Sequence, residues 1–279
     1  MVGQAAGGWS LWATVGVRDV RAASAAYAGL GFRPAWRGTV PDAAARRWGA
    51  PGSAGRDAAV LAPPGQGGGV RLVATGSAPA PPLGTLGWAA MELASNDLEA
   101  MAERLDAHGF RLLRGPAPLG SNPAIRAMQW AGPDGEAIYV ADLSAYAGAF
   151  DLIRPRQVLE GMFIAVLSAP DLPAARAFHV AALGAETRSD AEVVVPVLNA
   201  AQALPDDTRH RISTSQLPGG CAIEVDAARS GVPARGVAPG ELPAGVAVVS
   251  LAREAPLFDA PAHCLTGAAG ELIELPEPA

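Results

Sequence analysis

The sequence has few of the residues that build disulfide-stapled or metal-knuckle proteins. Its 279 residues include two cysteines and four histidines, and 5% of the chain is aromatic. Cys221 and Cys264 both stand inside apolar runs, far from the spacing of a metal knuckle. The sequence therefore predicts no disulfide framework, and both cysteines are typical of small core side chains in a reducing compartment.

Basic clusters and long hydrophobic runs are also missing. The formal net charge is -6, and the arginines are scattered singly or in pairs. This excludes the concentrated positive surface that a nucleic-acid partner requires. No apolar run reaches the length of a membrane span, and residues 1–10 lack the pattern of a secretory signal. We therefore expect a cytoplasmic protein that binds neither nucleic acid nor a membrane.

One pattern of elements recurs along the chain. In each copy a short alternating strand ends at an aspartate that can cap a helix, an amphipathic helix follows, and further strands come after it. Asp19, Asp97 and Asp171 mark three copies, and Pro256 leaves a fourth copy little room for its helix. One strand, one helix and then several strands predict an α+β fold.

Four sequence marks support a family assignment. They are, in order, Val17-Arg-Asp19 before a helix reaching Leu30-Gly31-Phe32, Gly132-Pro-Asp-Gly135 before Ile138-Tyr-Val140, Ala169-Pro-Asp171 before Ala177-Phe-His179, and Gly270-Glu-Leu-Ile-Glu-Leu275. With these marks the chain resembles the vicinal-oxygen-chelate superfamily of glyoxalases, bleomycin-resistance proteins and extradiol dioxygenases. The resemblance implies two domains, each a cupped mixed sheet made of two paired βαβββ units with flanking helices.

The repeat and the resemblance together predict the domain boundaries. The first domain covers residues 8–143, with units 8–77 and 85–143. The second covers residues 162–277, with units 162–228 and 243–277, and its last helix is short or absent. Residues 144–161 are the expected linker.

The resemblance also implies a divalent metal in the cup, held by His or Glu side chains from the first and last strands of each unit. In this sequence the first-strand positions fall on Trp12, Trp88 and Ile164, and Tyr139 stands at a last-strand position. Imidazoles and carboxylates are thus largely missing from the first domain, and we expect no metal cofactor.

Side-chain alternation predicts an aromatic lining for the first cup. If Gly132 to Gly135 form a two-residue hairpin turn, Met128 lies opposite Tyr139. The predicted substrate-binding residues are Trp12, Thr14, Trp88, Arg126, Met128 and Trp130. Such a surface suits an apolar or aromatic small molecule, although aromatic side chains can also simply fill a cup.

Glu92 and Tyr139 are the candidate acid-base groups of the first cup. A carboxyl on an apolar wall has a raised pKa, which suits proton transfer near neutral pH. The alternative is a Glu92 side chain at the rim, in water or paired with an arginine.

His263 and Glu274 are the corresponding candidates in the second cup. If Gly267 to Gly270 form a matching two-residue turn, these two side chains face each other and can act as an acid-base pair. With Glu224 they are instead three ligands for one divalent metal, and a third interpretation makes His263 a core histidine.

Three functions follow from these interpretations. The first is a metal-independent enzyme of lyase or isomerase type that acts on a small apolar or aromatic metabolite. The second is a binding protein that sequesters a drug or metabolite, as bleomycin-resistance proteins do. The third is a metal-dependent, glyoxalase-like or dioxygenase-like enzyme with its site in the second domain. The sequence leaves open whether the protein also forms a homodimer.

Overall fold

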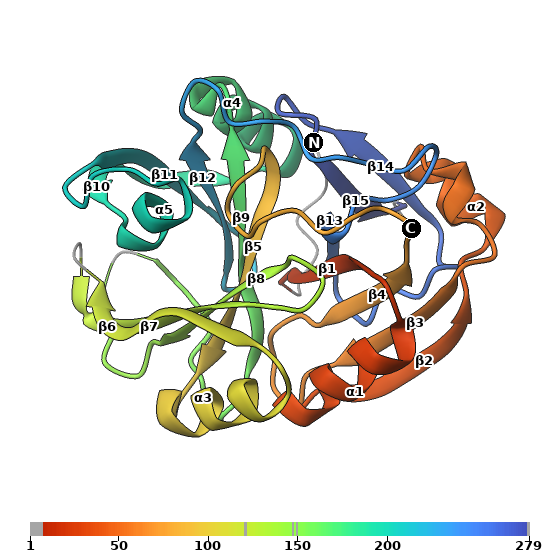
Figure 1. The fold of residues 1–279 in the computed structure, drawn as a ribbon, viewed down its shortest axis with the longest axis horizontal. Coiled ribbons are helices and arrows are strands. Elements are labelled where there is room, and N and C mark those ends of the chain that lie inside the picture. Colours follow the sequence, from red (N-terminus) through yellow and green to blue (C-terminus); the bar gives the residue numbers. More distant parts are fainter. Residues whose placement is uncertain (1–7, 120–121, 147, 149, 278–279) are drawn as a thin grey trace.

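The computed structural model describes residues 8–119, 122–146, 148 and 150–277 and contains two curled mixed sheets, which lie side by side in Figure 1. Sheet A consists of β1 (Ser10–Val17), β2 (Arg33–Thr39), β3 (Asp57–Ala62), β4 (Val70–Ala74), β13 (Gly245–Ala252), β14 (Ala262–Thr266) and β15 (Leu272–Pro276). Its strand order is β14-β15-β13-β1-β4-β3-β2.

Sheet B is formed by the middle of the chain. It consists of β5 (Gly87–Ser95), β6 (Arg111–Leu119), β7 (Asn122–Ala131), β8 (Ala137–Asp142), β9 (Gly161–Ala169), β10 (Glu186–Val194), β11 (Arg209–Leu217) and β12 (Cys221–Ala227). Its strand order is β10-β11-β12-β9-β5-β8-β7-β6. The predicted α+β fold of cupped mixed sheets, each made from two units, is confirmed.

Three longer helices begin at the predicted caps. They are α1 (Val20–Leu30), α3 (Leu98–Ala107) and α4 (Leu172–Leu183). The carboxylates of Asp19, Asp97 and Asp171 each accept hydrogen bonds from free N–H groups of the first helical turn. Two short helices, α2 (Asp42–Arg47) and α5 (Pro196–Ala201), and the 3-10 helix η1 (Pro51–Ser53) lie between strands of the first and third units.

The units pair differently from the prediction. The first unit shares sheet A with the fourth, because β1 pairs with β13, and the second shares sheet B with the third, because β5 pairs with β9. We expected the first to pair with the second and the third with the fourth. Since all four units present the same kind of first-strand edge, their repeated pattern does not specify which copy is the partner. Tertiary packing makes that choice.

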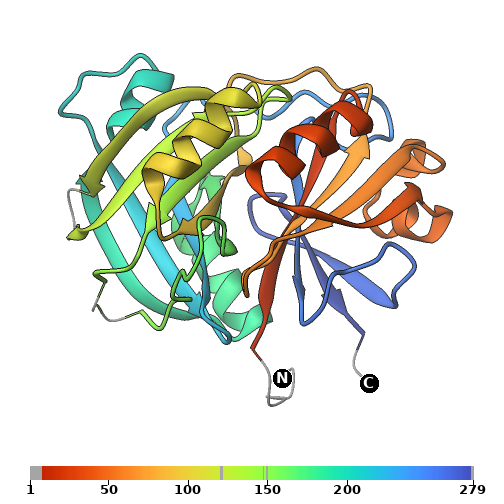
Figure 2. The ribbon, with the colours of Figure 1, turned by 90° about the horizontal axis from the view of Figure 1, so that it is seen from below.

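A central core lies between the two sheets and beneath the longer helices. It contains Leu11 and Val15 of β1, Met91 and Leu93 of β5, and Tyr27 of α1. Figure 2 shows α1 and α3 side by side where the sheets meet. Two smaller apolar clusters line the concave sides of the sheets. The sheets thus pack back to back, and each one keeps a separate cup.

The segment between β8 and β9 forms no helix or strand in its described residues, and residues 147 and 149 of the expected linker lie outside the described part. Within the described ranges no helix combines the length and the apolar character needed to cross a membrane.

Candidate functional site

Two hairpin turns determine which side chains face the cups. The N–H of Gly132 donates to the carbonyl of Glu136 at 2.7 Å, and the N–H of Gly267 donates to the carbonyl of Glu271 at 2.8 Å. Each turn is therefore one residue longer than the two-residue turn we predicted. A shift of one residue in register turns every side chain of a strand to the opposite face.

The carboxylates of Glu136 and Glu271 stabilise these longer turns. Glu136 accepts from the N–H of Asp134 at 3.0 Å and from the Tyr27 hydroxyl at 3.2 Å. Glu271 accepts from the N–H of Ala269 at 2.8 Å and lies 3.0 Å from Nε2 of His179. Each glutamate thus ties its turn to a helix of a different unit. The shared Gly-x-x-Gly-Glu pattern was the signal in the sequence that we did not use.

Three predicted ligand-binding side chains lie in the central core instead of a cup. Met128 pairs with Val140 and Trp130 with Ile138, so both point away from the concave face. A bulge in β5 puts Trp88 there too, where its Nε1 donates to the carbonyl of Leu272 at 3.0 Å. The predicted role of these side chains in binding is therefore wrong.

Arg126 also points away from the cup. It forms an ion pair with Glu99 of α3 at 2.8 Å, and 44% of its side chain is exposed. Since Arg126 pairs with Asp142 in the β7–β8 ladder, it belongs to the face opposite Tyr139. The same one-residue error in register explains this wrong prediction.

Trp12 and Thr14 do face a cup, but it is the cup of sheet A. The fully buried guanidinium of Arg71 occupies the centre of that cup. Its Nε donates to Thr14 Oγ1 at 2.8 Å, its Nη2 donates to Ser250 Oγ at 2.7 Å, and its Nη1 lies 2.6 Å from Glu274 Oε2. Thr14 therefore binds an arginine of its own chain.

Glu274 is held in the same cluster. Its Oε1 accepts from Arg47 Nε at 2.8 Å and from Trp48 Nε1 at 3.0 Å. Burial raises the pKa of Glu274, but Arg71 and Arg47 outweigh burial and bring this pKa to about 2. Glu274 is thus a permanently ionised partner of two arginines.

His263 does not join this cluster. It pairs with Leu275, whereas Cys264 lies opposite Glu274, and the His263 side chain is exposed. The predicted His263–Glu274 pair is therefore wrong. The alternative metal site is wrong as well, because Glu224 belongs to sheet B and the other two residues belong to sheet A.

Strand register relates the two cups position by position. In sheet A, Thr14 pairs with Arg71 and Ser250 with Glu274. In sheet B, Glu92 pairs with Tyr139 and Val166 with Glu224. The central positions that hold Thr14, Arg71, Ser250 and Glu274 in sheet A thus hold Glu92, Tyr139, Val166 and Glu224 in sheet B.

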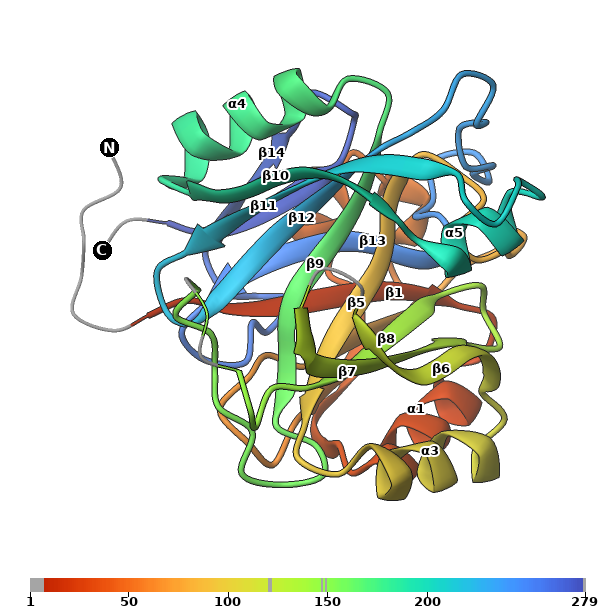
Figure 3. The ribbon, with the colours of Figure 1, turned by 90° about the vertical axis from the view of Figure 1, so that its left-hand side faces the viewer.

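Figure 3 shows the curl of sheet B, whose concave face carries four acidic groups: Glu92, Tyr139, Glu224 and Asp226. Burial, followed by the charge of Glu224, raises the pKa of Glu92 to about 8. Burial is also the main cause that raises the pKa values of Glu224 and Asp226. The pKa of the Tyr139 phenol is raised by burial and by the three nearby carboxyls. These groups hold protons that exposed carboxyls would release.

Two polar atoms of this cup have no partner among the described residues. They are the hydroxyl oxygen of Tyr139 and Oδ1 of Asp226. The Tyr139 side chain belongs to a residue that is 8% exposed, and Asp226 is 5% exposed. Buried polar groups are normally hydrogen-bonded, because an unpaired one costs about 1–3 kcal/mol. The two unpaired atoms make this cup the candidate site.

Part of the remaining wall of this cup is apolar. Ile164 and Val166 of β9, Val197 and Leu198 of α5, and Tyr146 contribute to it. An apolar wall with a few converging polar groups is typical of small-molecule sites.

The structure thus brings Glu92 and Tyr139 together as predicted and adds two carboxyls to them. Glu224 was predicted only as a metal ligand, and Asp226 was missed. Glu224 and Asp226 are two residues apart on β12, so they share a face. The alternating Glu-Val-Asp of residues 224–226 was the available signal.

The central positions of neither cup hold an imidazole. In sheet A the guanidinium of Arg71 already stands between Glu274, Thr14 and Ser250. In sheet B the central positions offer two carboxyls, a phenol and a valine, without an imidazole. Over the described ranges, no three His, Cys, Asp or Glu side chains are arranged to hold a metal ion.

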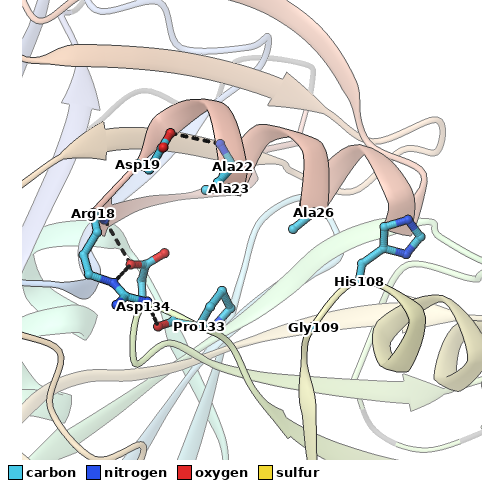
Figure 4. Close-up of a pocket in the computed structure, with 9 residues that line it drawn as sticks. All are labelled: Arg18, Asp19, Ala22, Ala23, Ala26, His108, Gly109, Pro133 and Asp134. Atoms are coloured by element: carbon cyan, nitrogen blue, oxygen red, sulfur yellow. Dashed lines mark hydrogen bonds and ion pairs between the residues drawn. The ribbon is translucent and has the colours of Figure 1, made fainter.

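A surface pocket of about 420 Å³ lies outside both cups, between α1 and the turn after β7 (Figure 4). Its polar side chains have partners within the fold. Asp134 accepts from the N–H and Nε of Arg18 at 2.9 and 3.0 Å, Asp19 caps α1, and His108 Nδ1 lies 2.8 Å from the carbonyl of Arg104. These groups stabilise the fold, and the cup of sheet B remains the candidate site.

Comparison with known proteins agrees with this architecture. The model of the Glyoxalase/Bleomycin resistance protein/Dioxygenase superfamily matches residues 9–140. A point mutant of glyoxalase I from Zea mays has a TM-score of 0.64 at 17% identity, over 96% of this chain and 94% of that one. A putative dioxygenase from Bacillus subtilis has a TM-score of 0.54 at 13% identity, over 97% and 84%. Such identities show the fold alone. No curated protein sequence matches the chain.

Proposed function

We propose that this chain, whose residues 9–140 match the model of the glyoxalase, bleomycin-resistance and dioxygenase superfamily, is an enzyme with its active site in the cup of sheet B. It acts on a small, largely apolar or aromatic metabolite by general acid-base chemistry of lyase or isomerase type, without a metal. The observation that carries this proposal is the group of four acidic side chains in this cup, of which Glu92, Tyr139 and Asp226 are buried and Glu224 is half-buried.

The four acidic groups have three roles. Glu92, with a pKa of about 8, is protonated at neutral pH and donates its proton as the general acid. Glu224 and Asp226, which share a face of β12, accept a proton from the substrate. The Tyr139 hydroxyl, which has no partner in the described part of the chain, donates a hydrogen bond to a substrate oxygen. The proton taken from one substrate atom is balanced by the proton returned to another, so no co-reactant is required.

The test is turnover in deuterated water. We incubate the protein with a small-molecule extract and search by mass spectrometry for compounds that are consumed and for products that carry solvent deuterium. Glu92→Gln and Tyr139→Phe should lower this turnover about 100-fold or more, since positioned acids and bases typically contribute factors of that size. Glu99→Gln, which changes an exposed carboxylate outside the cup, is the matched control.

Two results would contradict the proposal. If Glu92→Gln and Tyr139→Phe keep the full rate, the acid-base roles are wrong. If a compound is retained by the protein but never converted, the protein sequesters its ligand, and the binding function replaces the enzymatic one.

A further inference from the structure

The two cups differ in how their buried carboxyls are neutralised. In sheet A the carboxylate of Glu274 contacts the guanidinium groups of Arg71 and Arg47. In sheet B, no ion pair among the described residues includes Glu92, Glu224 or Asp226. Isolated buried charge is costly, so a cluster of this kind requires protons or an external cation.

No side chain of the protein supplies that cation. The chain contains 21 arginines and no lysine, and all the arginines are within the described ranges. None of them contributes to the pKa values of Glu92, Glu224 or Asp226. His210, on the same face of β11, is bound to Asn199 of α5 at 2.6 Å, and burial lowers its pKa, which favours the neutral ring.

The cup of sheet A shows which cation this kind of cup accommodates. Arg71 places a guanidinium between hydroxyl and carboxylate oxygens, with its Cζ 5.4 Å and 5.3 Å from the ring centres of Trp48 and Phe258. The position of Arg71 is held in sheet B by Tyr139. The position of the large Trp12 is held in sheet B by the small Ala90. Sheet B thus lacks both the guanidinium and the indole that fill the cup of sheet A.

We propose that the cup of sheet B binds a small organic cation, with an ammonium or guanidinium group placed against Glu224 and Asp226 and an apolar body against β9 and α5. This inference rests on the proposed function for the location of the site and names its substrate class. The unpartnered hydroxyl of Tyr139 and Oδ1 of Asp226 are the independent sign of a missing ligand, since both are buried and directed into the cup. The cation supplies donors for the carboxylate oxygens, and its neighbouring polar atom can accept from Tyr139.

The experiment compares probes of similar size and different charge on the full-length protein at neutral pH. Benzylamine and phenylguanidine are the cations, benzyl alcohol and phenylurea are their neutral counterparts, and benzoate is the anion. We expect both cations to bind at least about tenfold more tightly than their counterparts in calorimetric titrations, a difference of about 1.4 kcal/mol. Glu224→Gln should remove this preference, whereas Glu99→Gln should preserve it.

Proton release gives a second readout that does not depend on a variant. Because a nearby cation favours the charged form of a carboxyl, binding should expel about one proton from the cluster formed by Glu92, Glu224 and Asp226. The observed enthalpy for benzylamine should then vary with the ionisation enthalpy of the buffer, and that for benzyl alcohol should not.

The inference is overturned if the neutral probes or benzoate bind as tightly as the cations, if none of the five probes binds, or if Glu224→Gln keeps the preference. Its failure is distinguishable from failure of the proposed function. Cation binding without turnover contradicts only the enzymatic function, and Glu92-dependent turnover of neutral metabolites contradicts only the charge of the substrate.

Discussion

At the scale of single residues, Arg71 and Tyr139 occupy equivalent strand positions with opposite consequences. Arg71 neutralises Glu274 and fills its cup, whereas Tyr139 leaves three carboxyls without a positive partner in the described part of the chain. The buried ion pair is expensive to break, because removing one partner leaves an uncompensated charge.

Arg71→Met should therefore lower the free energy of unfolding by about 3–5 kcal/mol. The measurement is urea denaturation at neutral pH. The double variant Arg71→Met with Glu274→Leu should recover part of the loss, because it removes the buried charge together with its partner. Equal stability of the single variant and the unmodified protein would show that the pair contributes nothing.

Sequence reasoning identified some of these residues and missed others for definite reasons. Glu92 and Tyr139 were predicted because an acidic residue in an apolar alternating strand points to a buried site. Arg71 was missed because its strand pattern does not reveal a partner on β15, about 200 residues away along the chain. The register error at Glu136 turned Met128 and Trp130 to the wrong face.

At the scale of elements, the two cups differ in the short helix that lies beside each of them. The helix α2 leads into Trp48, which is 3% exposed and donates to Glu274. Its ring also packs edge-on against Phe258 at 5.8 Å between ring centres. The corresponding helix of the third unit, α5, brings Val197 and Leu198 to the other cup without a large aromatic ring.

Trp48→Ala should destabilise the protein by about 3–5 kcal/mol, because it leaves a cavity and removes a donor to Glu274. Thermal and urea unfolding measure the loss. Trp9→Ala, at a half-buried position just before β1, should cost less. Binding of small molecules in sheet B should not change, so a loss of binding in Trp48→Ala would contradict the assignment of the site to sheet B.

The helices themselves were predictable because their starts depend on local chemistry. Asp19, Asp97 and Asp171 cap their helices through contacts within three residues. The turn lengths were not predictable from the glycines alone, because a carboxylate beyond the second glycine decides where pairing resumes. Local sequence signals thus predict where the helices begin. The register of the two hairpins depends on side-chain contacts between units.

At the scale of the whole molecule, buried carboxyls make stability depend on pH in two directions. Burial raises the pKa of Glu92 from 4.5 to about 8 and that of Glu136 to about 7, so the folded state binds protons that the unfolded state has lost. Stability therefore falls as the pH rises from about 4.5 towards 8. The pKa of Glu274 is lowered to about 2, so its contribution is lost as the pH falls from about 4.5 to 2.

We expect the free energy of unfolding to be greatest near about pH 5 and to fall by a few kcal/mol towards about pH 8, since one unit of pKa shift corresponds to about 1.4 kcal/mol. Urea denaturation over this range measures the profile. Glu92→Gln should flatten its alkaline side, and the exposed control Glu99→Gln should not. A stability that keeps rising to about pH 8 would refute the protonated state of the cup.

The fold as a whole followed from the repeat and the family marks, but the partnership of the units did not. A repeated pattern predicts the helix and strands of each unit, but it does not predict which other unit pairs with it. Among the described residues, the central core, with Trp88 stacked on His179, joins the convex faces of the two sheets across unit boundaries. Such contacts link residues far apart in sequence, which local patterns do not encode.

The pairing of β1 with β13 also determines the order in which the two sheets can form during translation. Ser10 of β1 pairs with Ala252 of β13, which is translated 242 residues later. β1 therefore leaves the exit tunnel long before this partner strand. Sheet B, whose strands span residues 87–227, can close earlier. The candidate site can thus form before sheet A is complete, and one edge of β1 stays open to mispairing until β13 has been translated.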